Sequence, residues 1–336
     1  MIRKETHAAF DRLARAIDAA RRIVLTTHIN PDGDGLGSQV ALREMLIAKG
    51  KDVSVLNHHG VPPSYRFLDP EAVILKQFIP AGDAERVLAA DLIIVVDTNH
   101  PGRLGDMSGP VTESPAVKAI IDHHLEPDPF AGVVVADDAS CATGELVYRF
   151  LEHVGALPLS RTSAHALYTA IMTDTGSFRF PKTDGDVHRI IATLVDSGAD
   201  PVSSYESIYE TGPASRLKLL GRALSSMELH AGGAVCILAI TNRMFAETNT
   251  TEIDTDKIVT YAMTIGGVRT GILITELGDE LKLNIRTKGS IPANEIAKAF
   301  GGNGHLNAAG ARLGKASLEE IRPKVLAVTT SLLNKD

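Results

Sequence analysis

Short runs of apolar, often β-branched residues alternate with helical patterns along the first half of the chain. The apolar runs lie at residues 22–28, 52–57, 72–76, 92–97, 116–122 and 133–136. Residues 92–96 are apolar without a break, which is typical of a parallel strand that is covered on both faces. Between these runs, the patterns at residues 7–20, 36–49 and 83–90 predict helices. The alternation predicts an α/β domain with a doubly wound, mainly parallel sheet.

The pattern changes near residue 228. Up to that point the helical series continues at residues 142–153, 161–172, 186–197 and 214–227. Beyond Gly232 and Gly233 we predict strands at residues 234–240, 269–277 and 281–286, and helices at 254–263, 292–300 and 318–333. We therefore expect a first domain at residues 1–190, a helical linker at 191–228 and a smaller C-terminal α/β domain at 229–336.

Composition narrows the class of protein. The chain has 34 Lys and Arg against 41 Asp and Glu, a net charge of -7, whereas proteins that track long nucleic acid usually carry a basic surface. Any nucleic-acid substrate should therefore be short, or held by a few local cations. Met1 to Phe10 lacks a signal-like apolar stretch, no apolar run is long enough to span a membrane, and the two cysteines lie far apart in the sequence. These features favour a cytoplasmic protein that does not bind membranes.

Acidic and imidazole side chains gather where predicted elements end. The residues concerned are His28, Asp32, Asp34, Asp97, Asp122, His123, His124 and Asp174. Each lies at or just beyond the end of a predicted strand, except Asp174, which follows a predicted helix. Because ligands bind beyond the carboxyl ends of parallel strands, we expect these side chains to meet in one site.

Mixed Asp and His ligands suit divalent ions such as manganese. Two such ions about 3.5–4 Å apart can hold a phosphoryl group and activate a water for in-line attack. Each motif alone has a simpler explanation, since an Asn-Pro-Asp-Gly segment is commonly a turn and an Asp after a strand commonly caps a helix. Three strand ends that supply His, Asp and His-His together favour a metal site instead. His58-His59 also follows a predicted strand but lacks adjacent acids, and we interpret it as an ordinary loop pair.

Four segments resemble, in order, the motifs of the DHH phosphoesterase superfamily. They are residues 27–34, 95–98, 121–124 and 173–178. Residues 301–310, Gly-Gly-Asn-Gly-His-Leu-Asn-Ala-Ala-Gly, resemble the glycine-rich signature of the DHH-associated C-terminal domain. Within the superfamily, the chain is most similar in length and architecture to the NrnA-like oligoribonuclease and 3'-phosphoadenosine 5'-phosphate phosphatase group. The resemblance implies a catalytic domain at 1–190, a substrate-binding domain at 229–336, and an active site in the cleft between them.

The resemblance also implies a role for each clustered residue. His28, Asp32 and Asp97 would hold one cation. Asp34, Asp97, His123 and Asp174 would hold the other, so that Asp97 bridges the two. Asp122 would orient an imidazole from behind the site, and His124 would face the substrate phosphate. The implied cofactor is a pair of divalent cations, manganese first, with magnesium or cobalt as alternatives.

Substrate-binding residues are expected mainly in the C-terminal region. The resemblance implies phosphate or nucleotide contacts from Arg286 and from the loop residues Gly302, Asn303, Gly304 and His305. Asn303 departs from the family signature, which commonly has a third consecutive glycine at this position. Asparagine tolerates left-handed backbone better than most residues, so the loop can keep its shape and the change bears on substrate preference. Arg103, which follows Asp97 closely in the sequence, is a further candidate for binding phosphate.

The predicted activity is hydrolysis of short single-stranded oligoribonucleotides to mononucleotides, and of 3'-phosphoadenosine 5'-phosphate to AMP, by metal-activated hydroxide. A cyclic or linear dinucleotide phosphodiesterase is the alternative, because the same centre would serve both. A RecJ-like exonuclease fits a short acidic chain less well, and a family II inorganic pyrophosphatase lacks a comparable glycine loop. A non-catalytic nucleotide sensor has no need of a bridging carboxylate. The sequence leaves open whether the chain forms a homodimer.

Overall fold

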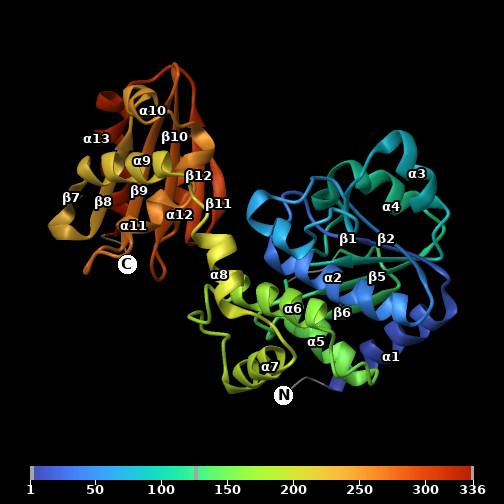
Figure 1. Cartoon of the computed structure of the whole chain (residues 1–336). Coiled ribbons are helices and arrows are strands. Elements are labelled where there is room, and N and C mark those ends of the chain that lie inside the picture. Colours follow the sequence, from blue (N-terminus) through green and yellow to red (C-terminus); the bar gives the residue numbers. More distant parts are fainter. Residues whose placement is uncertain (1–3, 125–127, 334–336) are drawn as a thin grey trace. The chain divides into compact units, whose positions relative to one another are not determined.

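The computed structural model describes residues 4–124 and 128–333, and the chain divides into two compact units at residues 1–211 and 212–336 (Figure 1). The first unit contains a six-stranded sheet with the order β3-β2-β1-β4-β5-β6, in which all neighbours are parallel. Its strands are β1 (Arg22–Thr26), β2 (Asp52–Asn57), β3 (Leu75–Gln77), β4 (Leu92–Val96), β5 (Val117–Asp122) and β6 (Val133–Ala136). The predicted doubly wound α/β fold is confirmed.

Helices cover both faces of this sheet. One face packs against α1 (Lys4–Ala19), α2 (Gly33–Ala48), α5 (Thr143–His153), α6 (Arg161–Asp174) and α7 (Gly185–Asp196). The other packs against α3 (Pro80–Leu88), η2 (Pro101–Met107) and α4 (Ser108–Glu113). The strand β4 serves both cores in alternation: Ile94 faces the first group of helices, and Ile93 and Val95 face the second. This burial on both sides explains why the strand is apolar at every position.

The strand order reverses between β1 and β4. From β1 the chain proceeds outward to β2 and β3, and from β4 it proceeds outward in the other direction to β5 and β6. The loops that follow β1 and β4 therefore diverge to opposite faces and leave a crevice at the carboxyl ends of these strands. Both loops carry residues that the sequence marks as metal ligands.

Three helices approach one another closely beside this crevice. A Cβ atom on Gly37 of α2 would lie 2.3 Å from the carbonyl oxygen of Ala166 in α6. A Cβ atom on Gly144, at the start of α5, would lie 2.6 Å from Cβ of Ala170 in α6. Both distances are far below van der Waals contact, so the helix backbones pack at a separation that only glycine permits.

The second unit contains a mixed sheet with the order β11-β12-β10-β9-β8-β7. Its strands are β7 (Glu228–His230), β8 (Val235–Ile240), β9 (Thr270–Leu277), β10 (Glu280–Thr287), β11 (Asn303–His305) and β12 (Ala308–Leu313). Only β8 and β9 pair in parallel. On one face lie α9 (Ala214–Ser225), α10 (Asn242–Thr248), η4 (Glu252–Thr255) and α11 (Ile258–Ala262), and on the other α12 (Ala293–Lys298) and α13 (Leu318–Leu333).

Several elements differ from the sequence predictions. A single helix predicted at residues 254–263 is instead η4 and α11, separated by Lys257 with a φ of 63°. The strands β7, β11 and β12 and the helices α4, α8 (Pro201–Tyr209) and α10 were not predicted. The strand β12 is rich in alanine and glycine, which have low β-propensity, so its sequence gives no strand signal.

The segment predicted as a linker, residues 191–228, is helical. It contains the end of α7, all of α8 and all of α9. Residues up to 211 belong to the first unit, and α9 belongs to the second. Across the described residues, no helix combines the length and apolar character needed to cross a membrane.

We predict that Gly37→Ala destabilises the protein by roughly 1–3 kcal/mol, because the added methyl group must push α2 away from α6. Gly221→Ala is the matched control, since Gly221 lies in α9 with open space around it, and the same change there should be neutral or stabilising by up to about 1 kcal/mol. Thermal unfolding measures both. Equal unfolding temperatures for the two variants would contradict the close packing of α2 on α6.

Candidate metal centre

The loop between β1 and α2 is fixed by its own side chains. Asp32 caps α2, and its Oδ1 accepts hydrogen bonds from the backbone N–H groups of Asp34 (3.1 Å) and Gly35 (3.3 Å). Nδ1 of His28 lies 2.7 Å from the carbonyl oxygen of Ile29. Because a carbonyl oxygen can only accept, Nδ1 carries the proton and Nε2 is turned toward the carboxylates.

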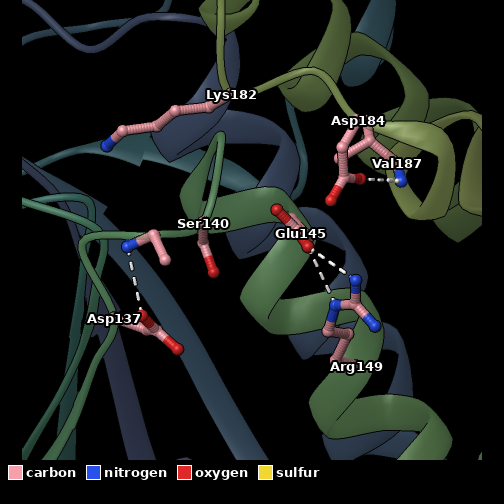
Figure 2. A pocket seen from close by; sticks show the side chains of 8 residues that line it. Asp137, Ser140, Glu145, Arg149, Lys182, Asp184 and Val187 are labelled. Carbon is pink, nitrogen blue, oxygen red and sulfur yellow. Dashed lines mark hydrogen bonds and ion pairs between the residues drawn. The ribbon is translucent and has the colours of Figure 1, made fainter. Parts of the chain in front are cut away.

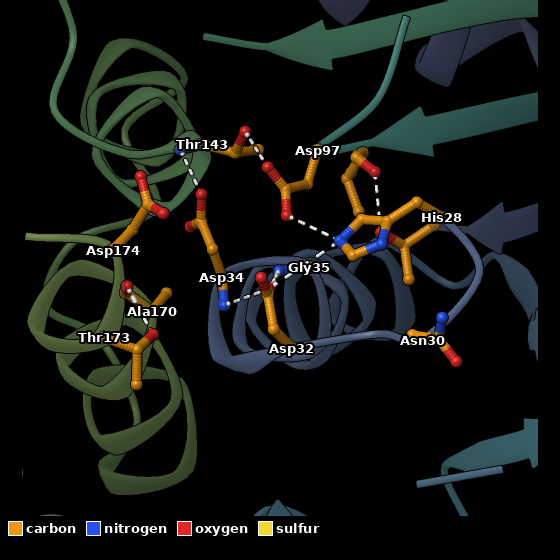
Figure 3. Close-up of polar contacts among 12 residues, drawn as sticks. His28, Asn30, Asp32, Asp34, Gly35, Asp97, Thr143, Ala170, Thr173 and Asp174 are labelled. Atoms are coloured by element: carbon orange, nitrogen blue, oxygen red, sulfur yellow. Dashed lines mark hydrogen bonds and ion pairs between the residues drawn. The ribbon is translucent and has the colours of Figure 1, made fainter. Parts of the chain in front are cut away.

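His28 and two carboxylates form the first ligand group. Nε2 of His28 lies 3.2 Å from Oδ2 of Asp97 and 3.8 Å from Oδ1 of Asp32. Figure 3 shows the two carboxylates turned toward the imidazole ring. Burial opposes a charged imidazole here, but the two carboxylates outweigh it and raise the pKa of His28 to about 10. A positive charge is thus strongly favoured between Nε2 and the carboxylates, and a divalent cation can supply it in place of the proton.

The second ligand group surrounds His123, the residue after β5. Its Nε2 lies 3.3 Å from Oδ2 of Asp174, 3.8 Å from Oδ1 of Asp97 and 3.9 Å from Oδ2 of Asp34. Its Nδ1 lies 3.4 Å from the carbonyl oxygen of Ser140, which again leaves Nε2 as the nitrogen that faces the acids. Asp97 faces both groups, with one oxygen toward each.

Asp34 is held by a helix start that the sequence analysis did not connect with the site. The N–H groups of Thr143 and Gly144, the first residues of α5, each donate to one oxygen of Asp34 at 2.7 Å. The hydroxyl of Thr143 donates to Oδ1 of Asp97 at 3.3 Å. A Thr-Gly pair at the start of a predicted helix is the signal that could have suggested it, since such N–H groups bind anions.

Asp97 has an unusual backbone conformation. Its φ is 60°, in the left-handed region that residues other than glycine rarely adopt. Its N–H donates to the carbonyl oxygen of Ile121 at 3.0 Å, and its side chain is 2% exposed. Conformational strain of this kind concentrates at functional sites, where the surroundings force it.

Three acids of the centre, Asp34, Asp97 and Asp174, resist ionisation together. Asp32 differs, because its contact with His28 outweighs the effect of burial and lowers its pKa. Burial raises the pKa of Asp34 well above its ordinary value, and the charges of Asp97 and Asp174 add to this effect. Burial likewise raises the pKa of Asp97, and it raises that of Asp174 to about 6. In the part of the chain that the structure describes, no lysine or arginine forms an ion pair with these acids. Carboxylate and imidazole donors without a balancing cationic side chain fit a pair of divalent cations.

His124 lies at the rim with a different set of contacts. Its Nδ1 lies 2.7 Å from Oδ1 of Asp122, a fully buried carboxylate, and this hydrogen bond raises the pKa of His124. Asp97, His123 and His124 also lie close enough together to form a third candidate group. Nδ1 of His124 is committed to Asp122, however, so His124 is a poor cation ligand through that atom. Arg103 lies close enough for its charge to oppose the shift, and its carbonyl oxygen accepts from the N–H of Ile29 at 2.7 Å.

A small cavity lies beside Ser140 (Figure 2). It is lined by Asp137, Ala139, Ser140, Glu145, Arg149, Lys182, Asp184 and Val187. Within it Arg149 forms an ion pair with Glu145 at 2.8 Å, and Glu145 accepts from the N–H of Cys141 at 2.9 Å. The ion pair thereby supports the backbone whose Ser140 carbonyl faces His123. None of the predicted ligands lines this cavity.

His58-His59, interpreted from the sequence as an ordinary loop pair, supports the loops of the centre. Nδ1 of His59 accepts from the N–H of Asn30 at 2.9 Å, and Nδ1 of His58 accepts from the N–H of Asp106 at 3.0 Å. The pair therefore ties together the loop after β1 and the turn η2, which carries Arg103. The loop pattern alone gives no sign of this role.

The predicted substrate residues of the second unit share one stretch of sheet. Arg286 of β10 pairs with Ala308 of β12, and Ala308 pairs with His305 of β11, so the three lie side by side on one face. Glycine is required in β11 and just before it for steric reasons. A Cβ atom added to Gly302 would lie 2.2 Å from the carbonyl oxygen of Gly310. A Cβ atom added to Gly304 would lie 2.4 Å from Cα of Ala309. The stretch expected as an open loop is therefore a tight hairpin.

We predict that the metal-free protein binds two Mn²⁺ ions per chain, and that Asp97→Asn abolishes tight binding of both, because Asp97 faces both ligand groups. Asp32→Asn should remove one ion and leave the other, since Asp32 contacts only the His28 group. Calorimetric titration measures both, with Asp186→Asn, an exposed acid paired with Arg189, as the control. Retention of two tight ions in Asp97→Asn would contradict a shared ligand.

Several known proteins are similar to this chain in sequence or in structure. The bifunctional oligoribonuclease and PAP phosphatase NrnA of Thermus thermophilus is 28% identical over 314 residues, which cover 93% of this chain and 90% of that protein. The cyclic-di-AMP phosphodiesterase PdeA of Listeria monocytogenes is 23% identical over 326 residues, which cover 94% of this chain and 48% of that protein. The structure of an exopolyphosphatase-related protein from Bacteroides fragilis is 29% identical, with a TM-score of 0.88 over 98% of this chain and 96% of that one.

Family matches cover both units. Residues 22–171 match the DHH family, N-terminal domain, and residues 232–331 match the DHHA1 domain. These matches confirm the resemblance drawn from the motifs at strand ends and from the glycine-rich segment. The chain therefore contains a DHH family N-terminal domain followed by a DHHA1 domain.

Proposed function

We propose that the chain hydrolyses short oligoribonucleotides to mononucleotides and 3'-phosphoadenosine 5'-phosphate to AMP. The observation that carries this proposal is the pair of ligand groups that meet at Asp97. Two groups of donors that share one carboxylate are the arrangement required to hold two cations side by side. Such a centre acts on phosphate esters, in which negative charge must be neutralised on several oxygens at once.

The proposed cofactor is two divalent cations, with manganese favoured because carboxylate and imidazole donors are mixed. When bound, the cations would neutralise the phosphoryl oxygens and lower the pKa of an attacking water. The chain itself supplies the alignment. The N–H groups of Thr143 and Gly144 fix the Asp34 carboxylate, and Ser140 fixes the ring of His123, so that little reorganisation is needed when substrate binds.

His124 is the proposed proton donor. The hydrogen bond from Nδ1 to Asp122 holds the ring and favours its protonated form, which leaves Nε2 able to donate. We propose that Nε2 of His124 hydrogen-bonds a phosphoryl oxygen or protonates the leaving oxygen. Arg103 is the proposed second contact to phosphate, because its charge lies near His124.

Arg286 and His305 are the proposed contacts for the part of the substrate away from the cations. Arg286 forms no ion pair among the described residues, and its guanidinium contacts only the carbonyl oxygen of Ile285. An arginine without a carboxylate partner is available for a phosphate group. Gly302, Asn303 and Gly304 are proposed to shape the hairpin that presents His305.

A cyclic or linear dinucleotide phosphodiesterase is the second candidate. It is favoured by the similarity to a cyclic-di-AMP phosphodiesterase, although the chain spans about half of that relative's length. The oligoribonuclease and PAP phosphatase relative aligns over nearly all of both chains, and for that reason we place the first proposal ahead. We propose the cytoplasm as the compartment, where the two free, buried cysteines would stay reduced.

The proposal is tested by initial rates on oligoribonucleotides of two to about ten units, 3'-phosphoadenosine 5'-phosphate, cyclic di-AMP and pyrophosphate with Mn²⁺. We expect the highest kcat/KM at two to about five nucleotides, because a chain of net charge -7 gains little affinity from further phosphates. Rates that climb with strand length would favour a RecJ-like exonuclease. Activity on cyclic di-AMP alone would favour the second candidate, and binding without turnover would indicate a sensor.

The pH profile tests the role of His124. Activity should fall as the pH rises through the pKa of His124, because the donated proton is then lost. Asp122→Asn replaces the charged acceptor with a neutral amide oxygen, which weakens the interaction that raises this pKa, so the alkaline fall should begin at a lower pH. His124→Gln should lower kcat by about 100-fold or more and remove that limb of the profile. An unchanged alkaline limb in Asp122→Asn would contradict the assignment.

A further inference from the structure

One face of the second sheet carries a band of polar residues that we name the polar strip. It consists of Arg286, Asn284 and Lys282 of β10, Ala308, Gly310 and Arg312 of β12, and Asn303 and His305 of β11. Alternation along β10 and β12 assigns these residues to one face, since the residues between them, such as Ile285 and Ala309, are buried beneath α12.

The strip has three rows, because directly paired residues lie side by side. The first row is Arg286-Ala308-His305, the second is Asn284-Gly310-Asn303, and the third is Lys282-Arg312. Rows lie about 6.8 Å apart along the strands, and neighbouring strands lie about 4.8 Å apart. In the first two rows, a small residue of β12 stands between longer polar ones. The side chains of Arg286 and His305, and those of Asn284 and Asn303, are therefore separated only by the small residues Ala308 and Gly310.

The first and third rows differ in their available charge. Arg286 makes no ion pair among the described residues. In the third row, Lys282 donates to Oε1 of Glu252 at 2.8 Å, and Arg312 donates to the same oxygen. These contacts lower the pKa of Glu252, so it stays ionised, and Oε2 of Glu280 lies 4.0 Å from Arg312, so two carboxylates balance the two cations of that end. An anion can therefore pair with Arg286 in the first row, whereas the cations of the third row are already paired with carboxylates.

The second row carries amides with free hydrogen-bonding capacity. Asn284 is half-buried, and its side chain has no hydrogen-bond partner among the described residues. At the other end of this row, Oδ1 of Asn303 accepts from the N–H of Gly304 at 2.8 Å, which leaves its NH₂ group available. An asparagine amide offers both a donor and an acceptor, the combination that pairs with the edge of a nucleobase.

We propose that Asn284 is a specificity-determining residue that hydrogen-bonds the nucleobase of the nucleotide whose phosphate lies at Arg286 and His305. We further propose that Glu252 sets the length limit, because together with Glu280 it neutralises the two cations that a further phosphate would meet. This inference rests on the proposed function for its substrate class. On this proposal, the second row binds the nucleobase, and the third row limits the binding of longer strands.

Removal of the Asn284 amide tests the first part. Asn284→Ala should raise KM for a diadenylate roughly two- to tenfold, the range of one neutral hydrogen bond, with kcat nearly unchanged. Hydrolysis of bis-p-nitrophenyl phosphate, which has no nucleobase, should not change. Asn294→Ala is the matched control, since Asn294 lies on α12, which covers the opposite face of the sheet. An unchanged KM for diadenylate, or an equal loss on both substrates, would overturn the assignment.

Release of the ion cluster tests the second part through a gain. Glu252→Gln should raise kcat/KM for a ten-unit oligoadenylate roughly two- to tenfold at low salt and leave diadenylate unchanged, with the gain disappearing at high salt. Glu247→Gln is the matched control, because Glu247 also pairs with two arginines, Arg243 and Arg222, but lies on α10. An unchanged length profile in Glu252→Gln, or the same shift in both variants, would overturn the proposed limit.

A binding measurement separates this inference from the proposed function. Diadenylate is titrated into the full chain with EDTA present, so that no turnover occurs. Weaker binding to Asn284→Ala than to the wild-type chain supports the strip even if the metal-loaded protein hydrolyses no nucleotide. Equal binding to both, beside normal hydrolysis by the wild-type chain, overturns the strip and leaves the proposed function standing.

Discussion

The contact between α2 and α6 sets the geometry of the candidate metal centre. Because Gly37 allows the backbone of α2 to approach the carbonyl oxygen of Ala166, the start of α2 and the end of α6 lie close together. Asp34 belongs to the first turn of α2, and Asp174 is the last residue of α6. The same close packing at Gly144 brings the N–H groups of α5 onto Asp34. Helix separation thus decides whether the ligands of the second group reach a common point.

The cost of this arrangement is electrostatic. Buried carboxylates near one another raise the pKa values of Asp34, Asp97 and Asp174, and backbone N–H groups offset only part of that cost. Imidazoles complete each ligand group, and hydrogen bonds from Nδ1 to carbonyl oxygens turn Nε2 inward at both His28 and His123. The fold therefore holds a concentration of negative charge that cations relieve. The strained φ of Asp97 is consistent with a residue that two groups must share.

In the second unit, the charged side chains of the proposed binding surface are cationic rather than acidic. The unit presents cationic side chains on a sheet face and then neutralises some of them with Glu252. With a chain that is acidic overall, selective neutralisation confines attraction for phosphate to a few residues. Substrate length would then be limited by which cations are left unpaired, rather than by the number of cations on the surface.

The sequence by itself determined the fold class and the identity of the clustered acids and imidazoles. Local causes make these features recognisable in the sequence. The strand β4 is apolar throughout because both faces are buried, and the candidate ligands other than Asp174 follow the ends of buried strands. The sequence suggested two alternative roles for Asp32, a helix cap or a candidate metal ligand. It did not indicate that one side chain could have both roles. The glycine-rich segment was recognised, yet the hairpin of β11 and β12 was not, because its strands are too rich in glycine and alanine to show a strand pattern.

Only the tertiary structure decided which residues support the candidate ligands. Thr143 lies 109 residues from the Asp34 that it holds, and His59 lies 29 residues from the Asn30 that it holds. No local pattern encodes such pairings, since each depends on how helices pack and on which loops become neighbours at the reversal of strand order. Strand register likewise decided that Asn284, Arg286 and His305 share a face with Glu252-bound Lys282. Residue type and spacing along the chain specify candidate chemistry, whereas contacts between distant segments specify where each side chain is held and whether its charge is free.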